Sequence, residues 1–318
     1  MKNIIKIGVS SCLIGEKVRW NGDHKENTYI KDILCKYFEY VPVCPEVEAG
    51  MGVPRETVAL YGNHQMLKMM GEKTQIDWTD KMNRYAKERI EGLVKENLCG
   101  YIFKSKSPSC GLTRIPVYSE IDNSKIRYQS GLFTDAFIKS NRLCPTEDEE
   151  RLVDPRLREN FLVRVFSFAR LKSELLNKKA SPRDIVGFHA QHKFLLLSHS
   201  RKHCQALGRI VAEVKNKPWN NVLSCYAYTF MQALTLKSTP KKHTDVLLHM
   251  MGFLKKILNK EEKEDLLASI EDYKKELIPL IVPATLLYYQ VKKHNIKYLL
   301  DQVYLNPAPK ELMLRNNV

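Results

Sequence analysis

The chain has 318 residues with a hydrophobic content of 44% and a charged content of 27%, values that exclude a disordered or fibrous protein. No run of about 18 apolar residues occurs, which argues against a membrane span, and the first residues predict a strand rather than a signal peptide. The net charge of +15 lies almost wholly in the second half, because residues 1–150 hold 22 Lys and Arg against 21 Asp and Glu, whereas residues 151–318 hold 29 against 15. This basic half favours a polyanion such as nucleic acid or an anionic membrane face, with a merely solvated Lys-rich surface as the alternative.

Eight cysteines are spread along the chain, and no CxxC pair occurs. In a long chain without an export signal, this spread argues against a disulfide framework and favours a cytoplasmic protein. The missing CxxC pairs also argue against zinc ribbons, thioredoxin-like sites and ferredoxin spacing. Ligation of a metal or cluster, or simple burial, must account for the cysteines.

The first half alternates strand-like and helix-like segments. Short apolar runs predict strands over residues 2–10, 39–44 and 100–104, and helical periodicity predicts a helix over 79–97. Strands separated by helices predict an α/β domain over residues 1–150, with an open, mainly parallel, Rossmann-like sheet.

The second half has a different pattern. Residues 145–160 are polar, charged and contain prolines, which predicts a linker. Beyond it, mixed apolar and basic periodicity predicts an all-α domain over residues 151–318. Helices are expected over 159–177, 181–202, 222–236, 243–258, 260–276 and 283–294, with an extended tail.

A cysteine follows or closes each of the three predicted strands, within the motifs SSCLIG (10–15), VCPE (43–46) and KSKSPSCG (104–111). Because the loops beyond the carboxyl ends of parallel strands gather into one crevice, we expect Cys12, Cys44 and Cys110 to converge. Small residues, proline and nearby cations surround each cysteine and are conditions that favour the thiolate. Three buried structural cysteines in turns are the alternative.

Three thiolates without a fourth protein ligand suit an iron–sulfur cubane that leaves one iron open to substrate. An open iron can act as a Lewis acid and binds sulfur well, so a sulfur-bearing substrate fits it. Zinc held by three cysteines and a water is the competing interpretation, and it is disfavoured because no histidine lies near the motifs.

Three blocks of the first half, in this order, resemble the signature of the thiouracil desulfidase family: SSCLIGEKVRWNG, VCPEVEAGMGVPRE and KSKSPSCG. The resemblance covers about residues 4–145, and it departs from the family at Trp20 and Asn21, where relatives often carry Tyr and Asp. Segments of the second half resemble the helical domain fused to that desulfidase in proteins that remove sulfur from thiouridine in tRNA: RLVDPRLRENFLVRVF, GFHAQHK, KHTDV, PLIVPATLL and PAPKELMLRN.

This resemblance implies a [4Fe–4S] cluster bound by Cys12, Cys44 and Cys110, with one open iron that takes the sulfur of the substrate. It implies that Glu46 is the acid/base carboxylate and that Ser107 or Ser109 is its polar catalytic partner. The implied reaction is a non-redox, hydrolytic cleavage of the C–S bond of thiouridine in tRNA, which gives uridine and hydrosulfide. A solvated or salt-bridged carboxylate is the alternative role for Glu46.

Polar residues beside the three motifs are the candidates for substrate binding: Arg19, Asn21, Arg55, Lys104 and Lys106. In the helical half, the histidines at 189, 192, 199 and 203 have the spacing of one helical stripe, which favours an RNA-facing or structural role over a second metal site. The candidate RNA-binding residues are His189, His192, Lys193, Arg201, Lys202, Lys242 and His243.

We therefore expect a cytoplasmic desulfidase whose second half binds thiolated tRNA in a salt-dependent way, without membrane contact or an obligatory protein partner. The target uracil must swing out of the tRNA to reach the crevice. Two other functions stay open, namely desulfidation of free thiouracil and a non-enzymatic iron–sulfur sensor that binds nucleic acid. The charge asymmetry favours tRNA over free thiouracil but does not separate the enzyme from the sensor.

Overall fold

The computed structural model describes residues 4–62, 67–177 and 179–316. The chain forms two compact units, unit 1 (residues 1–154) and unit 2 (residues 155–318). Residues 2 and 3 of the first predicted strand lie outside the described residues. Among the described residues, no helix is both long enough and apolar enough to span a lipid bilayer.

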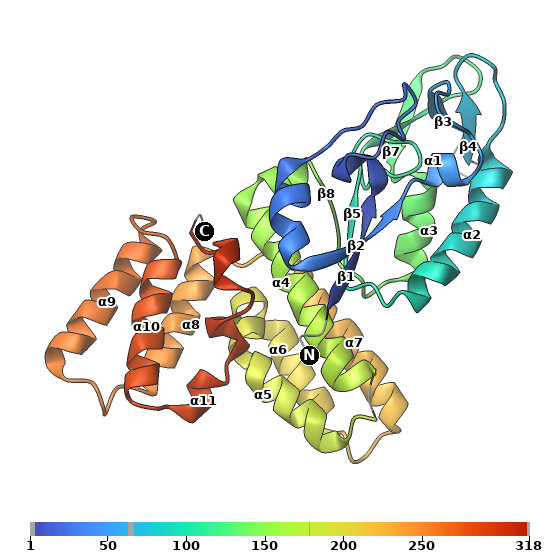
Figure 1. Ribbon diagram of the computed structural model, residues 1–318. Helices are drawn as coiled ribbons and strands as arrows, with labels where there is room; N and C mark the ends of the chain where they lie inside the picture. Colours follow the sequence, from blue (N-terminus) through green and yellow to red (C-terminus); the bar gives the residue numbers. More distant parts are fainter. Residues whose placement is uncertain (1–3, 63–66, 178, 317–318) are drawn as a thin grey trace. The chain divides into compact units, whose positions relative to one another are not determined.

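Unit 1 contains a four-stranded parallel sheet, sheet A, in the strand order β2-β1-β5-β8 (Figure 1). Its strands are β1 (Ile5–Ser10), β2 (Phe38–Val43), β5 (Tyr101–Phe103) and β8 (Thr146–Asp148). The register pairs Ser10 with Val43, so β1 and β2 end side by side. Sheet A confirms the prediction of an α/β domain with a mainly parallel sheet.

A second four-stranded sheet, sheet B, was not predicted. Its order is β4-β3-β6-β7, with a parallel pair at the centre and antiparallel pairs at both edges. Its strands are β3 (Val58–Gly62), β4 (Leu67–Gly71), β6 (Ile115–Tyr118) and β7 (Lys125–Gln129). These strands have only four or five residues each, and the edge strand β7 is largely exposed. None of them therefore contains an apolar run long enough to be recognised as a strand in the sequence.

The core of unit 1 joins sheet A to helices α2 (Thr79–Lys95) and α3 (Leu132–Ser140), which pack against each other. Helix α2 buries apolar residues at helical spacing: Met82, Ala86, Ile90 and Leu93. On β5, the rings of Tyr101 and Phe103 lie 4.0 Å apart, centroid to centroid. A side chain at Gly8 on β1 would put its Cβ 2.2 Å from the Tyr101 ring, so this close packing requires glycine.

The boundary between the two units lies after Asp154, within the predicted linker 145–160, but the segment is not irregular, because it contains strand β8 and the start of helix α4 at Pro155. Three of its carboxylates, those of Glu147, Asp148 and Glu149, are buried. The carboxylate of Glu147 accepts a hydrogen bond from Arg151 Nε at 2.5 Å, and that of Glu149 accepts one from the Ser105 backbone N–H at 2.8 Å. Part of the charge in this stretch therefore lies on buried, hydrogen-bonded carboxylates, whereas Glu150, Arg151, Asp154 and Arg156 are exposed.

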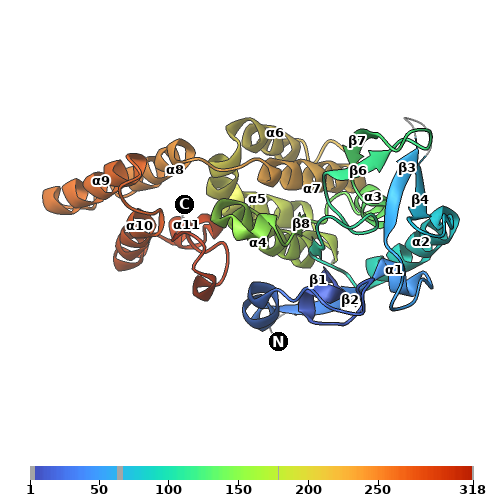
Figure 2. The same ribbon diagram turned by 90° about the horizontal axis from the view of Figure 1, so that it is seen from above.

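Unit 2 is helical, as predicted. Its α-helices are α4 (Pro155–Leu171), α5 (Pro182–His199), α6 (Arg201–Ala212), α7 (Trp219–Thr235), α8 (Pro240–Gly252), α9 (Lys260–Lys274), α10 (Ile281–Lys293) and α11 (Lys297–Leu300). Helix α5 packs against α6, α7 and α8 (Figures 1 and 2). The tail is not simply extended, since Val303–Leu305 and Lys310–Leu312 form short 3₁₀ turns.

The predicted helix over 181–202 is two helices, because Ser200 interrupts it. The backbone of Ser200 is extended (φ −158°, ψ 110°), and its Oγ accepts a hydrogen bond from the His203 N–H at 3.3 Å. Serine at this position ends α5 and caps the start of α6. His203 consequently belongs to α6, so the predicted stripe of four histidines on one helix is wrong.

His192, His199 and His243 are core residues with exposed fractions of 0%, 3% and 6%, so the prediction that His192 and His243 face RNA is wrong. The Nδ1 of His192 lies 2.8 Å from the carbonyl oxygen of Phe188, and that of His243 lies 3.0 Å from the Tyr304 hydroxyl. Burial lowers the pKa of all three imidazoles, to about 3 for His192 and to about 4 for His199. These three imidazoles are therefore uncharged in the folded unit and belong to its core.

Unit 2 is expected to lose stability in mild acid. Because the folded-state pKa values of the three histidines lie below that of the unfolded chain, only the unfolded state takes up protons as the pH falls below about 6.5. At pH 5, each histidine has lowered the free energy of unfolding by about 2 kcal/mol relative to neutral pH. Burial raises the pKa of Glu159 to about 6, and this carboxyl offsets part of the loss because the folded state takes up its proton first. Urea unfolding of the full chain at pH 7.5 and pH 5 measures the difference.

A variant separates this effect from general acid lability. His192→Phe keeps a ring beside Phe188, whose centroid lies 3.9 Å from that of His192, and removes one titrating group. It should reduce the loss of stability between pH 7.5 and pH 5 by about 2 kcal/mol. An unchanged pH dependence in this variant would contradict the assignment.

Candidate functional site

A cavity of about 590 Å³ lies at the carboxyl edge of sheet A in unit 1. The segments that follow β1, β2 and β5 line it, together with residues of sheet B. Cys12, Cys44 and Cys110 all lie in this lining. The parallel topology therefore brings together three cysteines that are far apart in the sequence.

Each cysteine is held by the turn that follows its strand. Cys12 lies in a 3₁₀ turn directly after β1, and this turn ends at Gly15 with a φ of 98°, a backbone conformation that favours glycine. Cys44 precedes the short helix α1 (Pro45–Glu48), and its Sγ lies 3.7 Å from the carbonyl oxygen of Val18. The carbonyl oxygen of Cys110 accepts a hydrogen bond from Thr134 Oγ1 at 2.7 Å.

Burial raises the pKa of the three thiols, whereas the sequence predicted surroundings that favour the thiolate. Desolvation raises the pKa of Cys12 to about 12, that of Cys44 above its usual value, and that of Cys110 well above it. The charge of Lys104 acts in the opposite direction on Cys12 but is the weaker effect. A positively charged ligand is therefore needed to convert these thiols to thiolates.

The arrangement of donors in the cavity does not match a site for a single ion. Within residues 4–62, 67–177 and 179–316, no three His, Cys, Asp or Glu side chains are placed to hold one metal ion. The three cysteines nevertheless line the same cavity. The cavity that they line has a volume of about 590 Å³.

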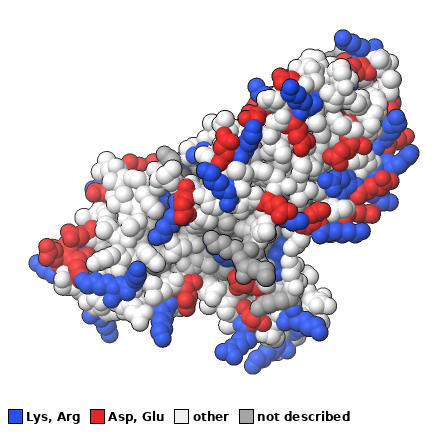
Figure 3. All heavy atoms as spheres, viewed as in Figure 1, with Lys and Arg blue, Asp and Glu red and all other residues white. Residues whose placement is uncertain are grey.

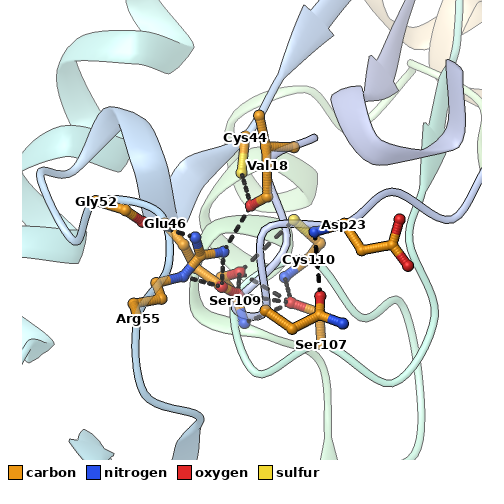
Figure 4. Close-up of polar contacts among 10 residues, drawn as sticks. Val18, Asp23, Cys44, Glu46, Gly52, Arg55, Ser107, Ser109 and Cys110 are labelled. Carbon is orange, nitrogen blue, oxygen red and sulfur yellow. Dashed lines mark hydrogen bonds and ion pairs between the residues drawn. The ribbon is translucent and has the colours of Figure 1, made fainter. Parts of the chain in front are cut away.

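Glu46 is the centre of a hydrogen-bond network in the cavity (Figure 4). Its Oε1 accepts hydrogen bonds from Ser107 Oγ at 3.0 Å and from Ser109 Oγ at 2.6 Å. Its Oε2 accepts two from Arg55, from Nε at 3.0 Å and from Nη2 at 2.6 Å. These four donors fix the position and orientation of the carboxylate, a group of the kind that acts as a general base.

The two serines differ in access to the cavity. Ser109 is completely buried, whereas Ser107 is half-buried. The Ser107 Oγ also accepts hydrogen bonds from the backbone N–H groups of Ser109 at 3.3 Å and Cys110 at 3.1 Å, and its own proton has Glu46 Oε1 at 3.0 Å and Ser109 Oγ at 2.9 Å as acceptors. Helix α3 supports this loop at Gly131, where a Cβ would lie 2.5 Å from the Ser109 carbonyl group.

Arg55 lines the cavity, where substrate binding was its predicted role, and its guanidinium group holds Glu46. Its side chain is only 6% exposed. Besides its bonds to Glu46, it donates to the carbonyl oxygens of Gly52 at 2.9 Å and Val18 at 3.0 Å (Figure 4). The guanidinium group therefore connects Glu46 to the loop that also contacts Cys44.

The other predicted substrate-binding residues divide into two groups. Arg19, Lys104 and Lys106 line the cavity, but Lys104 forms an ion pair with Glu149, and exposed Lys106 forms one with Glu150 at 2.7 Å. Asn21 does not line the cavity, which corrects its assignment. Its Oδ1 accepts a hydrogen bond from the Asp23 N–H at 3.3 Å within an exposed turn.

Sequence reasoning missed Glu149, which directly follows β8. Its carboxylate pairs with Lys104 and accepts hydrogen bonds from the N–H and Oγ of Ser105, both at 2.8 Å. The same rule that singled out the cysteines, a polar residue at the carboxyl end of a parallel strand, would have found it if β8 had been predicted.

The remaining candidates for RNA binding are Arg201 and Lys202, which are exposed, and Lys193, which is half-buried. His189 is also half-buried, and its Nδ1 lies 3.3 Å from the Tyr226 hydroxyl. Lys242 is committed elsewhere, because its Nζ donates to two backbone carbonyl groups at 2.7 and 2.9 Å. On the face seen in Figure 3, Lys and Arg side chains alternate with Asp and Glu.

Comparison with known protein families gives two matches. Residues 7–149 match the model of the 2-thiouracil desulfurase family, and residues 193–309 match that of a protein family of unknown function, DUF1722. The first match covers the three cysteine motifs and Glu149. The second lies within unit 2.

Three individual proteins are similar to the chain. The uncharacterized protein YbgA of Escherichia coli (strain K12) is 26% identical over 168 residues, which are 51% of this chain and 96% of YbgA. The uncharacterized protein YbbK of Bacillus subtilis (strain 168) is 31% identical over 112 residues, 32% of this chain and 71% of YbbK. A solved structure of the [4Fe-4S]-dependent thiouracil desulfidase TudS is 25% identical, with a TM-score of 0.38, over 47% of this chain and 94% of TudS.

Proposed function

The chain belongs to the 2-thiouracil desulfurase family through residues 7–149, and on this premise we propose that it removes sulfur from thiouridine in tRNA. The proposed enzyme uses a [4Fe–4S] cluster and gives uridine and hydrosulfide. The observation that carries the proposal is one cavity lined by three cysteines, two buried and one half-buried, and by a carboxylate with two serine hydroxyl groups.

The residues of the cavity fit a [4Fe–4S] cluster. Cys12, Cys44 and Cys110 supply three sulfur donors on a cavity of about 590 Å³ and are not placed for a single ion. Arg19 and Lys104 lie close to Cys12 and offset part of the negative charge of three thiolates. When bound, a cluster with three protein ligands supplies an open, thiophilic iron that polarises the thiocarbonyl group of the substrate.

The chain's own residues supply the proton chemistry. Glu46, held in place by Arg55 and the serines, is the base that accepts a proton from the attacking water. Arg55 occupies Oε2, so Oε1, on the side of the serines, is the oxygen that accepts the proton. The surrounding network fixes the orientation of this oxygen without requiring the side chain to move.

Of the two serines, Ser107 is the better candidate for proton transfer to the substrate. It is half-buried on the cavity lining, and its Oγ lies 3.0 Å from Glu46 Oε1. Fully buried Ser109 instead supports Glu46 at 2.6 Å and lies 3.6 Å from the sulfur of Cys110. Ser109 is thus the positioning residue of the pair.

A tRNA substrate is supported by the charge of the chain. Residues 151–318 carry 29 Lys and Arg against 15 Asp and Glu, an excess that attracts a polyanion and that a neutral free base does not need. A thiouracil base in tRNA must swing out from between its stacked neighbours to enter the cavity, as target bases do in other enzymes that act on nucleic-acid bases. Free thiouracil as substrate is the second candidate, because the family model names thiouracil itself.

Paired substrates test the proposal. Full-length protein, reconstituted with iron and sulfide without oxygen, is incubated in parallel with thiolated tRNA and with free thiouracil, and hydrosulfide and the modified nucleosides are quantified. We expect loss of thiouridine from tRNA, at a rate that falls steeply with added salt, and slower release from the free base. Release from free thiouracil alone would establish the second candidate. RNA affinity that changes with cluster loading, without any hydrosulfide, would identify a sensor.

A further inference from the structure

A group of aromatic rings lies at the surface of unit 2, at the carboxyl end of helix α8 and on helix α11. We call His249, Phe253 and Tyr298 the aromatic platform; His249 is exposed, and Phe253 and Tyr298 are 42% and 37% exposed. The rings of His249 and Phe253 are stacked with centroids 6.1 Å apart, and those of Phe253 and Tyr298 lie 5.4 Å apart. Three neighbouring rings at a protein surface form a place where a further flat ring can stack.

The platform is built on the core. Phe194 of α5 is completely buried and contacts all three rings, at centroid distances of 5.1 Å to His249, 6.2 Å to Phe253 and 6.3 Å to Tyr298. Because this anchor fixes their orientation, the rings lose little conformational freedom when a ligand stacks on them.

Unpaired cations border the platform. Lys193 and Arg201 lie close enough to His249 to lower its pKa, although partial burial is the larger cause. In the described part of the chain, Lys193, Arg201 and the neighbouring Lys202 form no ion pair, whereas other lysines of unit 2 do, such as Lys217 and Lys293. Cations without a carboxylate partner are available to a phosphate group.

From these features, we propose that the aromatic platform and its bordering cations bind an unpaired nucleotide of a single-stranded RNA segment, with the base stacked on the rings and the backbone phosphates on Lys193 and Arg201. Stacking on aromatic side chains beside a basic surface is how proteins bind single-stranded nucleic acid without reading its sequence. The excess of 14 positive charges in residues 151–318 favours this occupant over a protein partner. The inference rests on the proposed tRNA substrate and names the surface that holds it.

Binding and cross-linking of unmodified RNA test the platform independently of desulfidation. Full-length protein is titrated with a single-stranded oligonucleotide and with a duplex of the same sequence. Phe253→Ala and Tyr298→Ala should each weaken binding of the single strand about tenfold. Tyr228→Ala, which removes a tyrosine on α7 that is 50% exposed, should leave it unchanged. Lys193→Gln with Arg201→Gln should reduce the salt dependence of log K by about 1.4.

A second readout locates the base directly. A single strand that contains 5-iodouridine should form photo-cross-links to the platform residues, which are identified by mass spectrometry of the digested protein. Equal affinity for the duplex, wild-type binding by both alanine variants, or cross-links only outside the platform would overturn the proposal. Because no sulfur is present in this RNA, a failure here leaves the desulfidase proposal standing. If the protein binds RNA at the platform but releases no hydrosulfide from thiolated tRNA, the platform proposal stands and the desulfidase proposal fails.

Discussion

Replacing Glu46 by Gln is expected to lower the rate of hydrosulfide release by about a hundredfold to ten-thousandfold, the range that a general base contributes. The amide keeps the size of the side chain but cannot accept the proton of water. It also leaves the guanidinium group of Arg55 buried without its counter-ion, at a cost of about 3–5 kcal/mol in stability. Single-turnover rates and urea unfolding of the same preparations measure both effects.

A double variant separates the loss of chemistry from the loss of stability. Glu46→Gln combined with Arg55→Met removes the uncompensated charge, so it should regain stability but not activity. Glu39→Gln, a change of an exposed glutamate on β2, serves as the matched control and should leave the rate unchanged. Activity of the Glu46→Gln enzyme within a few-fold of the wild type, with full iron content, would exclude Glu46 as the base.

The convergence of the cysteines could be predicted from sequence because it depends only on topology. Parallel strands end at one edge of a sheet, so Cys12 after β1 and Cys44 after β2 had to lie near each other once the two strands paired. Cys110 follows its strand by seven residues, yet the loop back to the cavity is held by Gly111 and Gly131, whose lack of a side chain permits the close approach. The positions of the cysteines after the predicted strands were therefore sufficient to predict that they converge.

The role of Arg55 could not be predicted in the same way. Next to the VCPE motif, a cation can bind substrate or a carboxylate, and only the packing shows that it is 6% exposed and faces Glu46. The histidines of unit 2 gave a similar error, because their spacing fits one helix, whereas Ser200 has an extended backbone that ends α5 and caps α6. Likewise, the cations near the thiols were visible in the sequence, but the burial that raises the pKa of Cys12 to about 12 was not.

Alanine at Cys12, Cys44 or Cys110, one at a time, is expected to abolish cluster binding and to reduce hydrosulfide release to the level of iron-free protein. With three protein ligands, each thiolate carries a large share of the binding free energy, and the loss of one leaves two irons without protein contacts. Iron and sulfide content, the visible absorbance of the cluster and the rate with thiolated substrate are measured on each variant.

Matched controls come from cysteines that do not line the cavity. Cys99 and Cys204 have exposed fractions of 6% and 7%, against 6% for Cys110, so their replacement by Ala removes an equally buried sulfur. These two variants should keep full iron content and activity, with a change in stability alone, and exposed Cys35 and Cys225 should tolerate alanine as well. If Cys99→Ala or Cys204→Ala also lost the cluster, a ligand outside the cavity would be required. If one of the three cavity variants retained both iron and activity, that cysteine would not be a ligand. Either result would mean that the cluster is bound by a set of ligands other than the three cavity cysteines. It would also contradict the chemistry proposed for Glu46, which requires the sulfur of the substrate to be bound at an open iron.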